Sequence, residues 1–416
     1  MTKFMTAVAA LGLATCLTST SSNAAGFFLQ EQSVSGLGSA FAGQAAMPRD
    51  ASILFFNAAG MTYLEGRNGN IGVNIIAPVS DIDDTGTSNA SFGQPVGEDS
   101  DNPYDPTPVP NGYYTHQLND KVWAGIGISA PFGLGSEYDA DWFGRYDSIK
   151  TELKTINVQP TIAYKVNNRL SLGAGVDVQY ADAELTSAFF AGAEGRSILE
   201  GDDISYGYNL GAMYELTEQT RLGLSYRSQI NHKLEGDITL EGTGAADSTG
   251  SGKANLNLPE MVNLGVAHQL DNQTTLLAGA TWFGWSNFER ITATRDDGSL
   301  TSNVPQNYDN TWAFNIGAEY EYSPEWTFRG GIQYDETPTI DGSRTSRTPD
   351  GDRIWISSGA TYNVTDRLAW DFALTYIDVS EEDIDLTRPQ GVGSSSIDAK
   401  SSGDVYIGAI GLNYKF

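Results

Sequence analysis

Residues 156–180 read INVQPTIAYKVNNRLSLGAGVDVQY, and this stretch decides the fold class. Apolar residues hold every second position on both sides of a short turn signal at 166–169, and polar residues or glycine hold the positions between them. Side chains alternate between the two faces of a β-strand, so the pattern predicts two antiparallel strands joined by a tight hairpin. Each strand then has one apolar face and one polar face.

The same arrangement extends over most of the chain. Short turn signals occur at 118–121, 166–169, 216–219, 270–273, 322–325 and 364–367. Long polar stretches rich in Gly, Ser and Asp alternate with them at 79–108, 131–150, 187–202, 242–253, 297–307, 338–350 and 387–400. These connections predict an all-β fold, a 14-stranded antiparallel transmembrane β-barrel over residues 68–416. Such barrels have an even number of strands, short turns at one end and long loops at the other.

The alternative is a soluble β-sandwich, in which the strands have the same period of two. The C-terminus favours the barrel, because residues 406–416 keep the alternation to the last residue, Phe416. As the edge of a sandwich this strand would leave a long apolar edge unprotected. A final strand that closes on an aromatic residue is similar to the signal bound by the outer-membrane assembly machinery.

The N-terminus predicts export. Residues 1–24 combine Lys3, a short apolar core and small residues up to Ala24, as in a signal peptide cleaved after Ala24. Cleavage removes Cys16, the only cysteine, which excludes disulfides and cysteine-bound metals from the mature chain. The chain has 24 Lys+Arg against 52 Asp+Glu, a net charge of −28, which argues against nucleic-acid binding.

Residues 25–67 precede the first strand and show no alternation. They are rich in Gly and Ala, but Leu37, Phe41 and the run ILFF at 53–56 are too apolar for a solvated tail. A barrel of this size encloses more space than its own side chains can fill. We therefore predict that residues 25–67 form a small plug, or hatch, in the lumen.

Several local sequences match one family in order along the chain. They are AGF at 25–27, SGLGSA at 35–40, NAA at 57–59, PFGL at 131–134, LNLPEM at 256–261, WTFRGG at 326–331 and TPDGDRIW at 348–355. With them the mature chain resembles the long-chain fatty-acid transporters of Gram-negative outer membranes (FadL type), a family that includes transporters of aromatic hydrocarbons. The NAA sequence departs from the Asn-Pro-Ala usual in this family.

The resemblance implies that a hydrophobic ligand binds in the lumen, that the hatch moves, and that the ligand leaves sideways at a kink in the third strand. It assigns ligand contacts to Phe27 and Phe28, the hatch hinge to Asn57, Ala58 and Ala59, and the lateral gate to Pro131, Phe132, Gly133 and Leu134.

Further candidates for ligand binding follow from residue type and position. The alternation places Arg227, Arg329 and Arg353 on the lumen-facing side of their strands. They are candidates to pair with a carboxylate head group. The alternative is that these cations belong to ion-pair networks with the many carboxylates. Phe189 and Phe190, in an outer polar stretch, are candidates to contact an arriving ligand.

We expect a non-enzymatic uptake channel for hydrophobic compounds in the outer membrane, with long-chain fatty acids as the first candidate ligand and aromatic hydrocarbons as the second. A general polar porin is the alternative from another class. The sequence has no G-x-S-x-G elbow, phosphate loop or metal-ligand spacing of histidines, so we expect no catalytic residue, cofactor or metal. Expected partners are the ligand, outer-membrane lipid, lipopolysaccharide and the assembly machinery, and the chain is expected to be a monomer.

Overall fold

The computed structural model of the chain describes residues 26–244, 247–298 and 300–416. The predicted signal peptide, residues 1–24, lies outside the described residues. In the described part, one antiparallel sheet closes on itself, because β1 (Arg67–Asp84) pairs with β2 (Thr107–Gln117) on one side and with β19 (Ser394–Lys415) on the other. A closed sheet leaves no unpaired edge, which is the condition for crossing lipid with strands.

The sheet of 19 strand segments forms 14 spanning strands in the described residues, as predicted, because five spanning strands are each split in two. The split strands are β3 (Val122–Ser129) with β4 (Gly133–Glu137), β8 (Thr220–Arg227) with β9 (Ile230–Glu241), β10 (Ser248–Leu258) with β11 (Met261–Gln269), β12 (Thr274–Phe283) with β13 (Arg290–Arg295), and β14 (Leu300–Pro305) with β15 (Thr311–Glu321). The remaining segments are β5 (Lys150–Lys165), β6 (Leu170–Phe190), β7 (Glu194–Glu215), β16 (Trp326–Asp335), β17 (Arg353–Thr365) and β18 (Leu368–Pro389).

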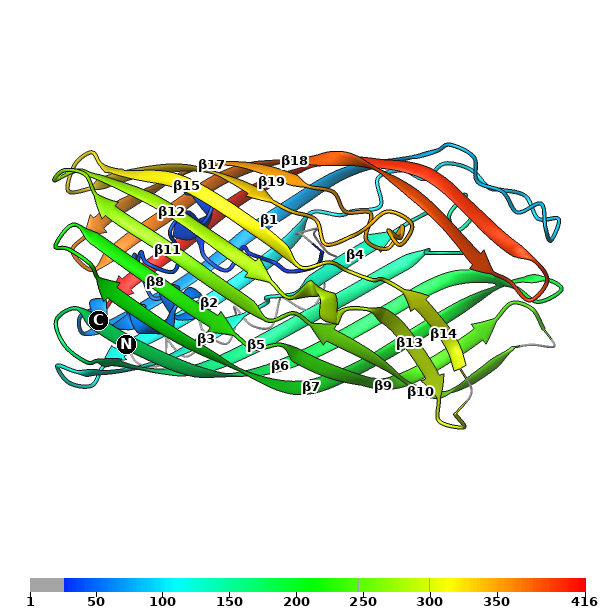
Figure 1. Cartoon of the computed structure of the whole chain (residues 1–416), viewed down its shortest axis with the longest axis horizontal. Coiled ribbons are helices and arrows are strands. Elements are labelled where there is room, and N and C mark those ends of the chain that lie inside the picture. The colour runs from blue at the N-terminus through cyan, green and yellow to red at the C-terminus, as the bar shows by residue number, and fades with distance from the viewer. Residues whose placement is uncertain (1–25, 245–246, 299) are drawn as a thin grey trace.

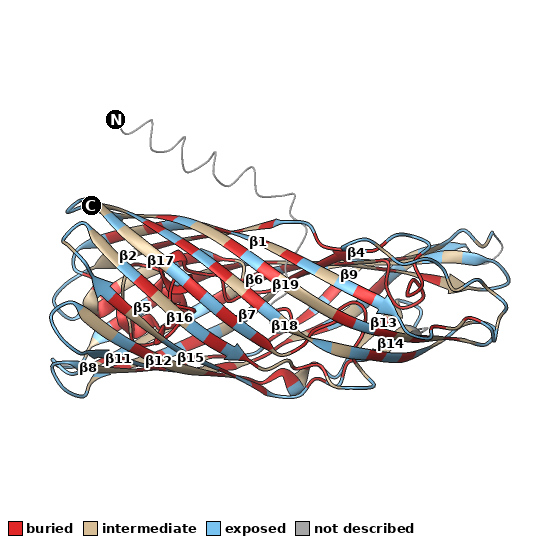
Figure 2. Ribbon diagram, turned by 90° about the horizontal axis from the view of Figure 1, so that it is seen from above, coloured by how far each residue is buried: buried red, intermediate tan, exposed pale blue. Residues whose placement is uncertain are grey.

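The two faces of the wall differ as the alternation predicts. Large apolar side chains such as Ile71, Ile316 and Leu374 are 60–68% exposed on the outside, where lipid covers them. Polar neighbours such as Asn157 and Asp177 are fully buried on the inside. Figure 2 shows the resulting stripes of buried and exposed residues along the strands.

The short turns gather at one end of the barrel and the long connections at the other (Figure 1). The predicted extents of several outer loops were wrong. β6 runs to Phe190 and β7 starts at Glu194, so most of 187–202 is strand, and β18 and β19 likewise leave only 390–393 as a connection. In these strand ends the buried apolar residues, such as Ile384, Leu386 and Ile397, are few and lie among polar and charged residues, so the sequence reads as a loop.

Four short helices lie in the described residues: α2 (Val34–Leu37), α3 (Ile53–Phe56), η1 (Ala58–Tyr63) and η2 (Trp285–Asn287). None of these helices is long and apolar enough to cross a membrane. The first three belong to residues 26–64, which we call the N-terminal segment. It lies inside the barrel near the end with the short turns (Figure 1), and almost all of its residues are buried.

The N-terminal segment packs directly on the wall backbone, and wall glycines make this approach possible. A Cβ atom at Gly223 would lie 1.9 Å from the carbonyl oxygen of Ala45, and one at Gly331 would lie 2.0 Å from that of Ser39. No other residue type fits at such a distance. Strands β8 and β16 therefore hold two separate parts of the segment at backbone contact.

Candidate functional site

A small cavity of about 20 Å³ lies between the N-terminal segment and the wall. Its apolar side is formed by Phe28, Phe55, Phe56 and Met261. The lining also carries amides and hydroxyls, namely Gln30, Gln44, Asn57, Asn209, Asn263, Ser225, Tyr226 and Thr281, together with the guanidinium of Arg227. Ligand pockets typically combine an apolar lining with a few fixed polar groups, so this small cavity suits the polar end of an amphiphile.

Arg227, at the end of β8, is the cation of this cavity. Its Nη1 forms an ion pair with Asp177 of β6, and its Nη2 donates to the backbone oxygen of Phe55 at 2.9 Å and to Gln159 Oε1 at 3.1 Å. Its guanidinium carbon lies 4.4 Å from the centroid of the Phe55 ring. The guanidinium is thus fixed from several sides by the wall and by the N-terminal segment.

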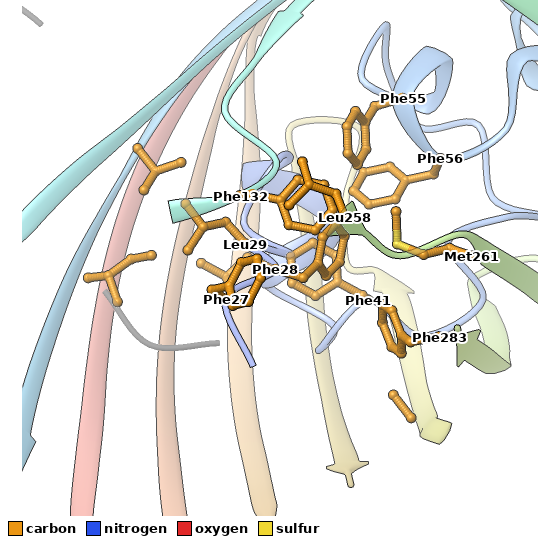
Figure 3. Close-up of a cluster of buried hydrophobic side chains, with 14 of the residues drawn as sticks. Phe27, Phe28, Leu29, Phe41, Phe55, Phe56, Phe132, Leu258, Met261 and Phe283 are labelled. Carbon is orange, nitrogen blue, oxygen red and sulfur yellow. The ribbon is translucent and has the colours of Figure 1, made fainter. Parts of the chain in front are cut away.

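Aromatic rings continue from the cavity towards the chain start (Figure 3). The Phe28 ring centroid lies 5.4 Å from those of both Phe132 and Phe283. The Phe27 ring packs edge-on against Trp285 at 4.7 Å. The segment therefore starts in an aromatic cluster that joins η2, the end of β12 and the connection between β3 and β4.

The wall is interrupted where the third spanning strand breaks, between β3 and β4. Among the described residues, β4 pairs only with β5, and residues 107–111 of β2 pair only with β1. The N-terminal segment pairs with this break instead: Leu29 N donates to the Pro131 carbonyl at 2.8 Å, and Gly133 N donates to the Phe27 carbonyl at 3.0 Å. The segment and the break are therefore hydrogen-bonded as one unit.

Asn57 joins two parts of the segment to the wall. Its Nδ2 donates to the carbonyl of Ala45 at 2.7 Å and to that of Ala212 in β7 at 3.0 Å, and its Oδ1 accepts from the backbone N–H of Ala59 at 3.1 Å. The side chain thus caps η1 and anchors it. Ala58 supplies the intervening backbone without the fixed φ of a proline.

Comparison with known proteins decides the family. The family described as "Outer membrane protein transport protein (OMPP1/FadL/TodX)" matches residues 15–416. The chain belongs to this family. It is an outer-membrane β-barrel, and its relatives transport hydrophobic compounds.

Individual relatives span nearly the whole chain. It is 29% identical to a long-chain fatty acid transport protein of Escherichia coli O6:H1, over 98% of both chains, and 29% identical to outer membrane protein P1 of Haemophilus influenzae, over 88% of this chain and 89% of that one. The crystal structure of a Pseudomonas aeruginosa FadL homologue, 26% identical, superposes with a TM-score of 0.88 over 94% of this chain and 100% of that chain. The Ralstonia pickettii toluene transporter TbuX, 22% identical, shares the fold with a TM-score of 0.66 over 88% of this chain and 94% of that one.

The structure of this FadL-family chain separates the ligand-binding candidates predicted from sequence. Phe28 and Arg227 line the cavity, and Phe27 lies in the adjoining aromatic cluster. Arg329 and Arg353 are buried away from the cavity. Arg329 lies between Glu319 and Asp371, and Arg353 pairs with Asp350. Both therefore belong to ion-pair networks, which was the alternative considered for these cations.

Phe189 and Phe190 lie at the outer end of β6, away from the cavity. The Phe190 ring packs 5.4 Å from that of Phe92. Two further aromatic residues of the outer stretch, Trp142 and Phe143, are also buried. Outer aromatic residues of this FadL-family chain thus pack on one another.

Three important residues were not predicted. Asp177 lies on the inward phase of β6, but its pairing with Arg227 joins positions far apart in sequence. Trp285 follows the interruption after β12 and is fully buried against Phe27. Glu31 is a fully buried carboxylate in the N-terminal segment. No sequence pattern singled out Glu31, which lies between Gln30 and Gln32.

Replacing Gly133 with valine should lower both ligand binding and uptake about tenfold, as expected for an overpacked contact. A Cβ at this position would lie 2.8 Å from Leu29 Cδ1, so the larger side chain pushes Leu29 away from the break. Uptake of radiolabelled ligand and its binding to purified protein test the change. Gly408→Val is the control, since the nearest atom to its Cβ is 3.9 Å away. Reduced uptake with unchanged binding would restrict Gly133 to the exit step.

Proposed function

We propose that this chain takes up long-chain fatty acids across the outer membrane by binding in the lumen, movement of the N-terminal segment and lateral release at the break between β3 and β4. The observation that carries the proposal is the pairing of residues 27–29 with residues 131–133 directly beside the cavity. A ligand that displaces Phe28 acts on the segment and on the wall break together. The fatty acid transport proteins among the relatives support this choice of ligand.

In this proposal residues 25–67 are the hatch, with a hinge at Asn57, Ala58 and Ala59. The side chain of Asn57 bonds to η1 and to β7 at the same time. A rotation of this one side chain would therefore release η1 from the wall. The residues from Pro131 to Leu134 form the lateral gate, since the wall ladder is interrupted there. Ligands that leave sideways enter the lipid and avoid the aqueous periplasm.

An aromatic hydrocarbon is the second candidate ligand, favoured by the phenylalanine rings on the apolar side of the cavity. A general polar porin fits less well, because the buried N-terminal segment occupies the lumen that such a porin needs open. We further propose that the protein acts as a monomer surrounded by outer-membrane lipid and lipopolysaccharide. Phe416, packed against Tyr414 and half exposed, is proposed as the contact for the assembly machinery.

A deletion of residues 26–40 tests the function. In a strain without its own fatty-acid transporter, the full chain should restore growth on oleate, and the deletion should reduce oleate uptake at least about tenfold, because it removes part of the cavity lining. The barrel should still assemble, since all its strands and Phe416 remain. Val392→Asp, at an exposed outer turn, is the control. If the full chain restored uptake of toluene but not of oleate, the second candidate ligand, an aromatic hydrocarbon, would be favoured.

A further inference from the structure

The cavity holds a single charged side chain among the residues that line it, Arg227, and that charge is already balanced. Asp177 lies directly behind the guanidinium and is fully buried. Asn157 Nδ2 donates to Asp177 Oδ1 at 2.8 Å, and Asn209 Nδ2 donates to Asp177 Oδ2 at 3.0 Å. Both carboxylate oxygens therefore receive hydrogen bonds, which fix the Asp177 side chain beside Arg227.

Three of the five N–H donors of the guanidinium have partners, and its positive charge is paired with a carboxylate. Its Nη1 is paired with Asp177, its Nη2 is shared between the Phe55 carbonyl and Gln159, and one face lies over the Phe55 ring. Arg227 lines the cavity, but together with Asp177 it forms an ion pair that has no net charge. It orients the cavity wall without supplying a free positive charge.

From this arrangement we propose that the cavity takes the carboxyl head group of the fatty acid in its undissociated form, with Asp177 as the residue that sets this specificity. The inference rests on the fatty-acid function proposed above. An ionised carboxylate would add a net negative charge at a buried site and would lose its hydration without an unpaired cation to replace it. A neutral head group can instead bond to amides and hydroxyls of the lining, such as Gln44, Asn263 and Ser225.

The wider lumen strengthens this preference, because buried carboxylates outnumber buried guanidinium groups in the described residues. The buried carboxylates are Glu31, Asp50, Asp147, Asp177, Glu319, Asp335, Asp350 and Asp371, and the buried guanidinium groups are those of Arg145, Arg227, Arg329, Arg344, Arg347 and Arg353. At pH 8, above the pKa of about 7 that burial gives Glu31, an anionic ligand would thus enter an interior whose buried charge is already negative.

Ligand binding to the purified full-length protein in amphipol at pH 8 tests the proposal with oleate and oleyl alcohol, which share a chain of the same length. The wild type should bind oleyl alcohol about tenfold more tightly than oleate. Asp177→Asn keeps the side-chain shape and leaves Arg227 without its counter-charge. The ratio of oleate affinity to alcohol affinity should then rise at least about tenfold, the effect of one hydrogen bond to a charged group.

Asp371→Asn is the matched control. Asp371 is a buried carboxylate paired with Arg329, and neither residue lines the cavity. The affinity ratio of this variant should equal that of the wild type. A wild type that binds oleate as tightly as oleyl alcohol overturns the proposal, and so does an unchanged ratio in Asp177→Asn. If Asp177→Asn does not fold, the wild type is tested with methyl oleate, the uncharged ester, instead. Tighter binding of oleate than of methyl oleate by the wild type would also overturn the proposal. Absence of binding by all three compounds would instead count against the fatty-acid function itself.

Discussion

Replacing Gly331 with valine should release the N-terminal segment from the barrel while the barrel itself still assembles. A Cβ at Gly331 would lie 2.0 Å from the carbonyl oxygen of Ser39 and 2.5 Å from its carbonyl carbon. These are backbone atoms, so no rotamer change relieves the overlap, and we expect docking of the segment to weaken by roughly 3 kcal/mol or more. The strand tolerates valine, because β-branched residues suit a pleated sheet.

Trypsin provides the measurement, since Arg49 is the only Lys or Arg between residues 26 and 64 and is held in an ion pair with Glu319. Cleavage after Arg49 should be rapid in Gly331→Val and slow in the wild type. The variant should also conduct ions in planar bilayers. The adjacent Gly330→Val is the control, because its Cβ points to the other face, where the nearest atom is 3.5 Å away. Equal protection of Arg49 in Gly331→Val and Gly330→Val would contradict the docking role of Gly331.

The barrel could be predicted because its strands and tight turns each leave a pattern within a short stretch of sequence. Alternation such as that from Ile156 to Tyr180 gives strand direction and face, and short turns such as 166–169 give the strand number. The outer strand ends were not predictable in this way. In 194–202 the only large apolar residues, Ile198 and Leu199, are consecutive, so the period of two is missing although the strand continues.

The candidate site was predictable only in part. Phe28 and Arg227 could be named from motif and phase, and both line the cavity. Their partners could not be named, because closure of the barrel brings Asp177, Gln159 and Phe55 to Arg227 from separate strands and from the segment. Residue type alone cannot tell a free cation from a neutralised one. The three arginines were therefore equal candidates before the structure, although only Arg227 lines the cavity.

Docking of the N-terminal segment should weaken as the pH rises from about 4.5 to about 7. Glu31 is fully buried, and neither of its carboxylate oxygens has a hydrogen-bond partner. Burial raises the pKa of Glu31 from 4.5 to about 7, against smaller opposing effects of the neighbouring backbone N–H groups and of Arg353. Asp335 is the other charged group that faces it, and Asp350 pairs with Arg353. The docked segment therefore holds Glu31 as the neutral acid at low pH.

The sign follows from the two states of the segment. Below about 4.5 Glu31 is protonated whether docked or free, and docking is strongest. Above 4.5 the free segment gains stability by ionising, whereas the docked one does not until about 7, so docking weakens by about 1.4 kcal/mol per pH unit across this window and no further above it. Hydrogen exchange of residues 26–45, corrected for the intrinsic rate, measures the change. Glu31→Gln should remove the pH dependence and keep the segment protected at pH 7, whereas Glu65→Gln, at an exposed position, should keep the wild-type profile. A Glu31→Gln variant with the wild-type profile would assign the pH dependence to Asp335 or to another group.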